Sequence, residues 1–235
     1  MQLEMLKPEL SLNQYQIDNT IVVYGSARVH SAETVEKILA QAQANNDTAT
    51  LQQAAQLRQG ARYYEDARQF ARLVAQHSSG QPRNQHYYIC TGGGPGIMEA
   101  ANKGAYEAGG VSVGLHIQLP HEQGCNKYVK TRCNFRYFFI RKFMFVKYAM
   151  AYVVMPGGMG TIDELSEAFV LAQTGRTRPF PIILYDSSYW SGLLEWLRKT
   201  MASRGFIKEG EIDKLITVCD TPEEVVNYLC RVIVA

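Results

Sequence analysis

The sequence has 235 residues and lacks a charge excess, a metal-type cysteine pattern and a long uninterrupted apolar run. Its 24 Lys and Arg residues nearly balance its 22 Asp and Glu residues, so it has no electrostatic footprint for general nucleic-acid binding. A local basic pocket is compatible with this balance. The five cysteines include no CxxC pair, so neither a zinc site nor a disulfide framework is indicated.

The closest set of candidate metal ligands is His116, His121 and Glu122. These residues lie near a proline and look like loop residues, and spacing alone rarely makes a metal site. We therefore expect neither a metal nor an organic cofactor.

The most apolar stretch, Tyr137–Met155, is interrupted by Arg141, Lys142 and Lys147. Charges near the middle of a bilayer are costly, so we expect no membrane span. Met1–Leu12 carries charges and lacks a continuous apolar core, which is unlike a signal peptide. We therefore expect a cytoplasmic protein.

The composition is that of a globular protein, with 46% hydrophobic and 20% charged residues, which excludes disorder, collagen and coiled coil. Short, nearly all-apolar runs alternate with segments of helical period, as is typical of strands covered on both faces by helices. The expected strands are Thr20–Tyr24, Tyr87–Cys90, Val111–Leu115, Tyr152–Met155, Pro181–Tyr185 and Leu215–Val218. The expected helices are Ala61–Gln76, Ile97–Ala108, Tyr137–Ala149, Ile162–Ala172, Tyr189–Ala202 and Pro222–Val234. This alternation predicts an α/β fold, a Rossmann-like, doubly wound and mostly parallel sheet, in one domain spanning residues 1–235.

Two stretches break this rhythm. The crossover from His30 to Gln85 is longer than one connecting helix requires, and we expect a surface helical insertion with a polar turn at Asn45–Asp47. A partner-binding or lid function for this insertion is the alternative. The stretch Leu119–Asn134 is irregular, and we expect a loop near the carboxyl edge of the sheet.

Two glycine-rich turns connect expected strands to expected helices. The first spans Cys90–Ala100 and the second spans Met155–Glu164. Glycine lets the backbone turn sharply and bring bare amides close to a ligand, and the following helix adds unpaired N–H groups that favour phosphate. A third junction, Gly25–Arg28, offers a hydroxyl and a guanidinium at the same edge of the sheet. A single turn of this kind is often only structural, but two after strands in one chain favour a phosphate site.

Neither turn matches a known nucleotide fingerprint, since GxGxxG and GxxxxGK[ST] are both absent. Glu164 follows the second turn by about one helical turn, so its carboxylate can return toward the mouth of the site. A simple interaction with the helix dipole is the alternative for Glu164, and Asp163 is a candidate for that role. Arg141 and Lys142 are two cations in a helix that is otherwise nearly all apolar, and Arg141 needs a partner, either a structural ion pair or a ligand. Ser26 and Met98 are further candidates, although residues at such positions often only pack.

Together these residues resemble the Lonely Guy (LOG) family. The matching motifs are Gly92–Met98, the pair Arg141-Lys142, and Pro156–Glu164, which reads PGGMGTIDE. The resemblance covers about Thr20 to Val218 and implies a phosphoribohydrolase, which cleaves a nucleoside 5′-monophosphate of the AMP or cytokinin type into free base and ribose 5-phosphate. It also implies a homodimer or larger homo-oligomer.

By this resemblance the catalytic residues are Arg141 and Glu164. The candidate substrate-binding residues are Ser26, Gly93, Gly94, Met98, Lys142, Gly157, Gly158, Met159, Gly160 and Thr161. The chain departs from compact members of the family in its long crossover and in Glu99, where many have glycine, and both leave the identity of the base open. Glu99 is also a speculative second carboxylate, and a covalent intermediate on Glu164 stays open.

A non-catalytic carrier of a nucleotide or of molybdenum cofactor is the main alternative function, since one phosphate would suit the same turns. A carrier has no need of the Arg141–Glu164 pair. Lysine decarboxylation would require a Schiff-base lysine, and no lysine here has such a context. The helix expected at Tyr137–Met150 is too apolar for a free surface, so it is either core or half of a dimer interface.

Overall fold

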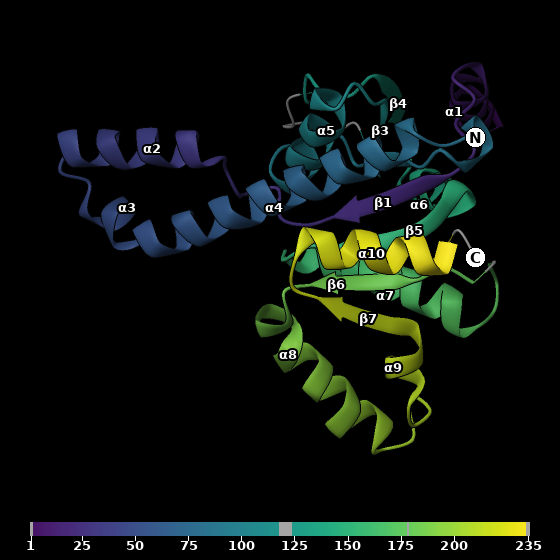
Figure 1. The fold of residues 1–235 in the computed structure, drawn as a ribbon. Helices are drawn as coiled ribbons and strands as arrows, with labels where there is room; N and C mark the ends of the chain where they lie inside the picture. The colour runs from purple at the N-terminus through teal and green to yellow at the C-terminus, as the bar shows by residue number, and fades with distance from the viewer. Residues whose placement is uncertain (1, 118–123, 178, 234–235) are drawn as a thin grey trace.

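The computed structural model describes residues 2–117, 124–177 and 179–233, which fold around one parallel sheet (Figure 1). Within these ranges the sheet has seven strands in the order β4-β3-β2-β1-β5-β6-β7, and every neighbouring pair is parallel. The strands are β1 Thr20–Tyr24, β2 Tyr88–Thr91, β3 Ser112–Ile117, β4 Thr131–Phe135, β5 Ala149–Val154, β6 Ile182–Tyr185 and β7 Ile216–Cys219. The expected Rossmann-like α/β fold is confirmed.

Helices cover both faces of the sheet. The α-helices are α1 Gln2–Gln14, α2 Ala32–Ala44, α3 Thr48–Gln52, α4 Ala54–Ser79, α5 Ile97–Glu107, α6 Phe138–Tyr148, α7 Met159–Gln173, α8 Ser187–Trp196, α9 Glu211–Leu215 and α10 Pro222–Ile233. A 3-10 helix, η1, spans Arg83–Gln85, and a π-helix, η2, spans Leu197–Ala202 at the end of α8. Side chains of α4, α5 and α10 form one core layer with Ile21 and Val23 of β1. Those of α1, α6, α7 and α8 form the other layer with Val22 and Tyr24. This alternation along a buried strand explains why β1 is apolar at every position.

Strand β4 was not expected from the sequence, because Leu119–Asn134 was interpreted as a loop. That interpretation is wrong for Thr131–Asn134, which pair in register with β3. The strand alternates buried Thr131, Cys133 and Phe135 with the exposed Arg132 and the half-buried Asn134. It lies at the edge of the sheet and lacks the all-apolar run that marks the central strands. Residues 118–123 of the expected loop lie outside the described part of the chain.

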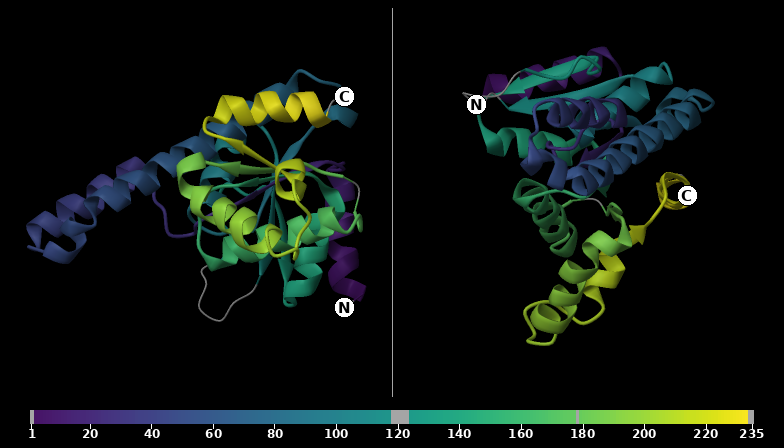
Figure 2. Two further views of the ribbon diagram at one scale, coloured as in Figure 1. Left: turned by 90° about the horizontal axis from the view of Figure 1, so that it is seen from below. Right: turned by 90° about the vertical axis from the view of Figure 1, so that its left-hand side faces the viewer.

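The long crossover forms an arm, defined here as α2, α3 and the first half of α4, which extends beyond the carboxyl ends of the strands (Figures 1 and 2). The polar turn expected at Asn45–Asp47 is confirmed. Asn46 has a φ of 54°, and the Asp47 side chain caps α3 by accepting from the Thr50 amide. Helix α4 continues from the arm onto the sheet, where Phe70 and Val74 are buried. The crossover therefore has two parts, the arm, which projects from the sheet, and the second half of α4, which covers one face of the sheet.

Helix α6 confirms the expected apolar segment and shows which of its residues are covered. Ile140, Met144 and Phe145 are buried in the core, whereas Phe138, Phe139 and Phe143 are about half exposed. An exposed aromatic face of this kind is unusual on a free surface. The homodimer expected from the sequence remains a prediction.

The α4–α5 contact depends on the absence of a side chain at Gly104. A Cβ at this position would overlap the carbonyl oxygen of Arg68 on α4. The two helices approach so closely here that even one methyl group has no room.

We therefore expect Gly104→Ala to lower the free energy of unfolding by about 1–3 kcal/mol, as overpacking does. Gly192→Ala is the matched control, because Gly192 is also helical but has open space around its missing Cβ. Alanine is the better helix former, so the control should be neutral or stabilise by up to about 1 kcal/mol. Urea unfolding of both variants measures the difference, and equal effects would contradict the packing argument.

Candidate functional site

A cleft of about 660 Å³ lies at the carboxyl ends of the strands, within the size range of small-molecule sites. The chain order reverses between β1 and β5, and ligands of doubly wound sheets bind at such switch points. The cleft is lined by Tyr24, Gly25, Ser26, Ala27, Arg28, Met98, Phe138, Arg141, Gly158, Met159, Gly160, Thr161, Asp163 and Glu164. All three glycine or serine junctions expected from the sequence contribute to it.

Ser26 connects the three junctions through backbone hydrogen bonds. Its amide donates to the Pro156 carbonyl at 3.0 Å, and its carbonyl accepts from the Ile97 amide at 3.0 Å. The pairing of β1 with β5 continues to this edge of the sheet, since the Met155 amide donates to the Tyr24 carbonyl at 2.8 Å. The loops after β1, β2 and β5 are therefore held as one unit, which fixes the wall of the cleft before any ligand binds.

Helix α7 begins in the cleft with uncapped amides. Its N-cap is Gly158, which has no side chain to accept from the first turn, and Gly158, Met159 and Gly160 are all exposed. Thr161 lies just behind them, and its hydroxyl occupies the space that a Cβ on Gly157 would fill. The first turn of α7 thus presents N–H groups and a hydroxyl to the cleft, the chemistry that binds a phosphate.

Glu164 is the carboxylate of the cleft, one turn further along α7. Its side chain is only 12% exposed, and Oε1 lies 3.8 Å from Arg141 Nη1 while Oε2 lies 3.3 Å from Lys142 Nζ. Burial raises the pKa of the Glu164 carboxyl above its usual value, and the charges of Lys142 and Arg141 oppose that shift. A desolvated acid beside two cations is a typical arrangement in a catalytic site.

Arg141 is held from three sides. Its Nε donates to the Leu115 carbonyl at 2.7 Å, and its guanidinium lies 5.1 Å from the centre of the Phe145 ring. With Glu164 as the third contact, both interpretations left open by the sequence apply, since Arg141 is in an ion pair and also lines the cleft. Three contacts restrict the guanidinium to one geometry.

Lys142 lies behind the cleft wall and binds three carboxylates of α7. Its Nζ is 2.9 Å from Asp163, 3.3 Å from Glu164 and 2.8 Å from Glu167. Burial alone would lower the pKa of Lys142, but the hydrogen bonds with Glu167 and Asp163 raise it above its usual value, so the ammonium stays charged. Lys142 thus supports Glu164 rather than lining the cleft.

Tyr24 is a lining residue that the sequence analysis missed. It ends β1, is 6% exposed, and packs against Tyr152 and Phe145. Burial raises the pKa of its phenol well above the usual value, and the nearby Glu164 charge adds to the shift. Its position in an apolar strand gave no signal in the sequence. Phe138 was likewise not selected, since its exposure to the cleft depends on the tertiary fold, whereas the Arg28 guanidinium expected at this edge of the sheet does line the cleft.

The expected site residues divide into two groups. Arg141, Glu164, Ser26, Met98, Gly158, Met159, Gly160 and Thr161 line the cleft, whereas Gly93, Gly94, Gly157 and Lys142 do not. Gly93 and Gly94 are buried, and their carbonyls accept from the side-chain amide of Asn126. The first glycine turn therefore shapes the cleft mainly through Met98. Glu99 also lies outside the lining, where it accepts a 2.9 Å hydrogen bond from the Tyr64 hydroxyl.

No cluster of three or more His, Cys, Asp or Glu side chains that could hold a metal occurs in residues 2–117, 124–177 and 179–233. Of the candidate ligands named from the sequence, His121 and Glu122 lie outside these ranges. None of the helices in the same ranges is both long enough and apolar enough to cross a membrane.

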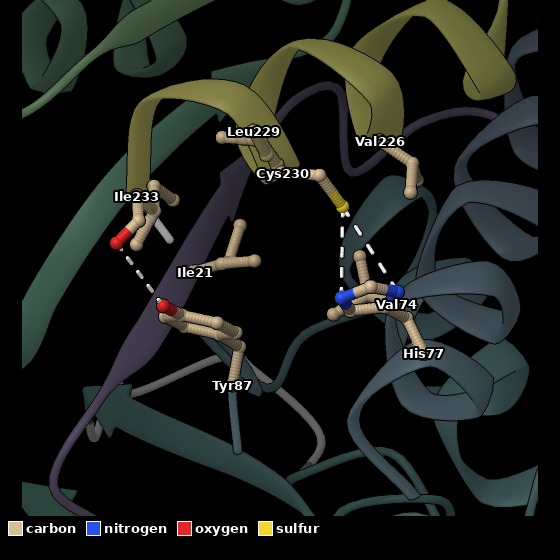
Figure 3. A pocket seen from close by; sticks show the side chains of 8 residues that line it. All are labelled: Ile21, Val74, His77, Tyr87, Val226, Leu229, Cys230 and Ile233. Carbon is tan, nitrogen blue, oxygen red and sulfur yellow. Dashed lines mark hydrogen bonds between the residues drawn. The ribbon is translucent and has the colours of Figure 1, made fainter. Parts of the chain in front are cut away.

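A second, small apolar cavity lies between α4 and α10 (Figure 3). Ile21 and Tyr87 line it from the beginnings of β1 and β2, so it is at the opposite end of the strands from the cleft. Cys230 Sγ and His77 Nε2 are 3.6 Å apart at its side. This cavity is a packing gap of the helix layer and takes no part in the cleft.

This chain is similar to the proteins of one family. The family model described as "Possible lysine decarboxylase" matches residues 98–229. A cytokinin riboside 5′-monophosphate phosphoribohydrolase of Mycobacterium marinum is 27% identical over 133 residues, which cover 54% of this chain and 68% of that protein. A protein of the same name from Arabidopsis thaliana is 32% identical over 90 residues, covering 38% of this chain and 40% of the relative.

Solved structures with the same fold include two molybdenum-cofactor proteins. The molybdenum cofactor binding protein of Rippkaea orientalis has a TM-score of 0.55 at 18% identity, covering 92% of this chain and 98% of that chain. The molybdenum cofactor carrier protein of Chlamydomonas reinhardtii has a TM-score of 0.52 at 18% identity, covering 93% and 99%. At this identity the likeness shows the fold alone.

The raised pKa of Glu164 predicts a pH-dependent stability. The folded state holds the proton of this carboxyl more tightly than the unfolded state does, so the wild type loses stability as the pH rises above the ordinary value of 4.5. Glu164→Gln has no charge to bury, and Lys142 keeps Asp163 and Glu167 as partners. We expect the variant to gain stability relative to the wild type as the pH is raised from 4 to 8.

Glu195→Gln serves as the control with the opposite sign. Glu195 is exposed, and its hydrogen bond with Lys199 lowers the pKa of its carboxyl, so removal of this charge should cost stability as the pH rises. Thermal unfolding across the pH range measures both variants. A Glu164→Gln variant that loses stability relative to the wild type toward pH 8 would show that the carboxylate is not penalised by burial.

Proposed function

Because this chain belongs to the family described as possible lysine decarboxylase, the LOG family, we propose that it is a nucleoside 5′-monophosphate phosphoribohydrolase. It would hydrolyse the N-glycosidic bond of AMP or of a cytokinin-type nucleotide to free base and ribose 5-phosphate. The observation that carries the proposal is the cleft itself, in which the uncapped start of α7 and the buried Glu164 carboxylate lie one helical turn apart. The names of the curated relatives support the same reaction class.

The first turn of α7 is the proposed binding site of the 5′-phosphate. The N–H groups of Gly158, Met159 and Gly160 and the Thr161 hydroxyl offer hydrogen bonds, and the helix dipole adds a partial positive charge. A phosphate held there is remote from the bond that breaks. Its binding energy therefore serves to hold the ribose over the rest of the cleft.

Glu164 is the proposed catalytic carboxylate. Departure of a base from C1′ leaves positive charge on the ribose, as in glycoside hydrolysis. The Glu164 carboxylate can stabilise that charge and orient or deprotonate the attacking water, whose proton it accepts. Burial raises the pKa of this carboxyl, and the charges of Lys142 and Arg141 act against that rise. Asp163 is the second carboxylate of the lining and is 66% exposed on its side chain, so water reaches this part of the cleft.

Arg141 is proposed to act at the leaving base. Its geometry is fixed by Leu115 and Phe145, and its guanidinium lines the cleft beside Glu164. A fixed cation stabilises negative charge as it develops on the departing base, without reorganisation during the reaction. Binding without catalysis, the alternative named from the sequence, would use the α7 amides but would not need this cation and acid to meet.

The proposal predicts release of adenine from AMP. Glu164→Gln and Arg141→Ala should each lower kcat by about 10²–10⁴-fold, the usual effect of removing a general base or a preorganised charge. Glu9→Gln is a suitable control, since Glu9 pairs with Lys147 outside the cleft. Chromatographic separation of adenine and AMP measures the reaction, with prenylated and pyrimidine monophosphates as further substrates. The assignment of the site would fail if both variants retained full activity on the best of these substrates.

A further inference from the structure

Tyr189 of α8 contacts the glycine turn that leads into α7, although it is not among the residues that line the cleft. Its hydroxyl donates to the Gly157 carbonyl at 2.6 Å. Gly157 directly precedes Gly158, the N-cap residue of α7, whose amide belongs to the proposed phosphate site. The proposed function assigns no part to Tyr189.

Three successive carbonyls of this turn are held by different groups. The Pro156 carbonyl accepts from the Ser26 amide at 3.0 Å. The Gly158 carbonyl accepts from two amides in the first turn of α7, at 3.0 and 3.1 Å. In residues 2–117, 124–177 and 179–233, the Gly157 carbonyl between them accepts only from the hydroxyl of Tyr189. The outer two carbonyls are thus held by the backbone and the middle one by a side chain.

The peptide group between Gly157 and Gly158 needs such a contact to keep one orientation. Rotation of a peptide group changes ψ of the residue before it and φ of the residue after it, and glycine tolerates both changes. A peptide group between two glycines therefore turns over at little backbone cost. Once turned over, it would present a carbonyl oxygen to the cleft in place of an N–H group, and the oxygen would repel a phosphate.

Tyr189 holds this peptide group in the orientation that suits an anion. The N–H of a trans peptide group points opposite to its C=O, and every peptide bond in the described ranges is trans. Because the Gly157 C=O points to Tyr189, the Gly158 N–H points away from Tyr189, and Gly158 lines the cleft. The hydroxyl thus sets the direction of the first amide of the proposed phosphate site.

Tyr189 is itself fixed at the start of α8. Its amide donates to the Asp186 carboxylate at 3.2 Å, and its ring packs edge-on against the buried Trp190 with ring centres 5.0 Å apart. The Asp186 carboxylate also accepts from the Tyr63 hydroxyl of α4 at 2.7 Å. The phenol is therefore positioned before a ligand binds.

We propose that Tyr189 is a positioning residue of the phosphate site. Its hydroxyl holds the peptide group between Gly157 and Gly158 so that the Gly158 N–H donates to the phosphate of the bound nucleotide. The proposal rests on the placement of the phosphate at α7 in the proposed function. Tyr189 acts through the backbone and touches neither the phosphate nor the sugar.

Tyr189→Phe tests the proposal, because it removes the hydroxyl and keeps the ring beside Trp190. In the full-length Glu164→Gln background, chosen to keep AMP intact, it should weaken AMP binding by about three- to tenfold, the net effect of one hydrogen bond. Calorimetric titration measures this, and thermal unfolding checks that the variant folds. Adenosine, which lacks the phosphate, should bind with unchanged affinity.

Tyr87→Phe is the matched control. The Tyr87 hydroxyl also donates to a backbone carbonyl, that of Ile233 at 3.4 Å, but it lies at the opposite end of the strands from the cleft (Figure 3). This variant should leave AMP affinity unchanged. Ribose 5-phosphate is the second probe, and Tyr189→Phe should weaken its binding by the same factor as that of AMP, since both ligands carry the phosphate.

Gly158→Ala separates positioning from a general loss of structure. The missing Cβ of Gly158 has open space around it, and its φ of −90° suits alanine, whereas the turned-over peptide group would require a positive φ that alanine avoids. Alanine should therefore hold the peptide group without help from the Tyr189 hydroxyl. In a double-mutant cycle, we expect Tyr189→Phe to weaken AMP binding less when Gly158→Ala is present than when it is absent.

The proposal is overturned if Tyr189→Phe leaves the affinities for AMP and ribose 5-phosphate unchanged, if adenosine loses as much affinity as AMP, or if the loss is the same with and without Gly158→Ala. Failure of the proposed function gives a different result. In that case the wild type would release no base from any monophosphate, while the dependence of AMP affinity on the Tyr189 hydroxyl could still be measured.

Discussion

Glu164 is a mostly buried carboxylate that faces two cations, and the chemistry of the cleft depends on this contact. Burial penalises its charge, while Arg141 and Lys142 stabilise it. Arg141 is fixed by the Leu115 carbonyl, and Lys142 is fixed by two further acids of α7. Helices α6 and α7 are thereby tied together at the mouth of the cleft. The same α7 offers its bare first turn one turn away, so one helix carries both the phosphate-binding amides and the reactive acid.

Much of this arrangement could be predicted from sequence because it is local. The Pro156–Glu164 segment is a strand, a glycine turn and a helix in succession, and the offset between its amides and its acid follows from helical geometry. The central strands could be located because each is apolar throughout. Arg141 drew attention because a charge in an apolar helix needs a partner.

Other features depend on contacts between distant segments and had no local signal. Strand β4 lies at the sheet edge and has the polar residues Arg132 and Asn134 between its buried ones, so it lacks the all-apolar run that located the central strands. Tyr24 lines the cleft only because β1 ends beside α7, and nothing in TIVVY marks that tyrosine. The glycines Gly93 and Gly94 fit a ligand-binding turn by sequence, but Asn126 from a distant loop binds their carbonyls and they are buried. Arg141 lines the cleft and Lys142 does not, and this difference between two adjacent cations could likewise be seen only in the three-dimensional structure.

In the proposed function, α7 holds a nucleotide's phosphate at its start and presents Glu164 to the sugar. A crystal structure of Glu164→Gln with bound AMP tests this most directly, because the variant retains the shape of the site and leaves the substrate intact. We expect phosphate oxygens hydrogen-bonded to the amides of residues 158–160, with C1′ of the ribose facing the residue 164 side chain. A phosphate bound elsewhere in the cleft, or a ribose turned away from residue 164, would contradict it.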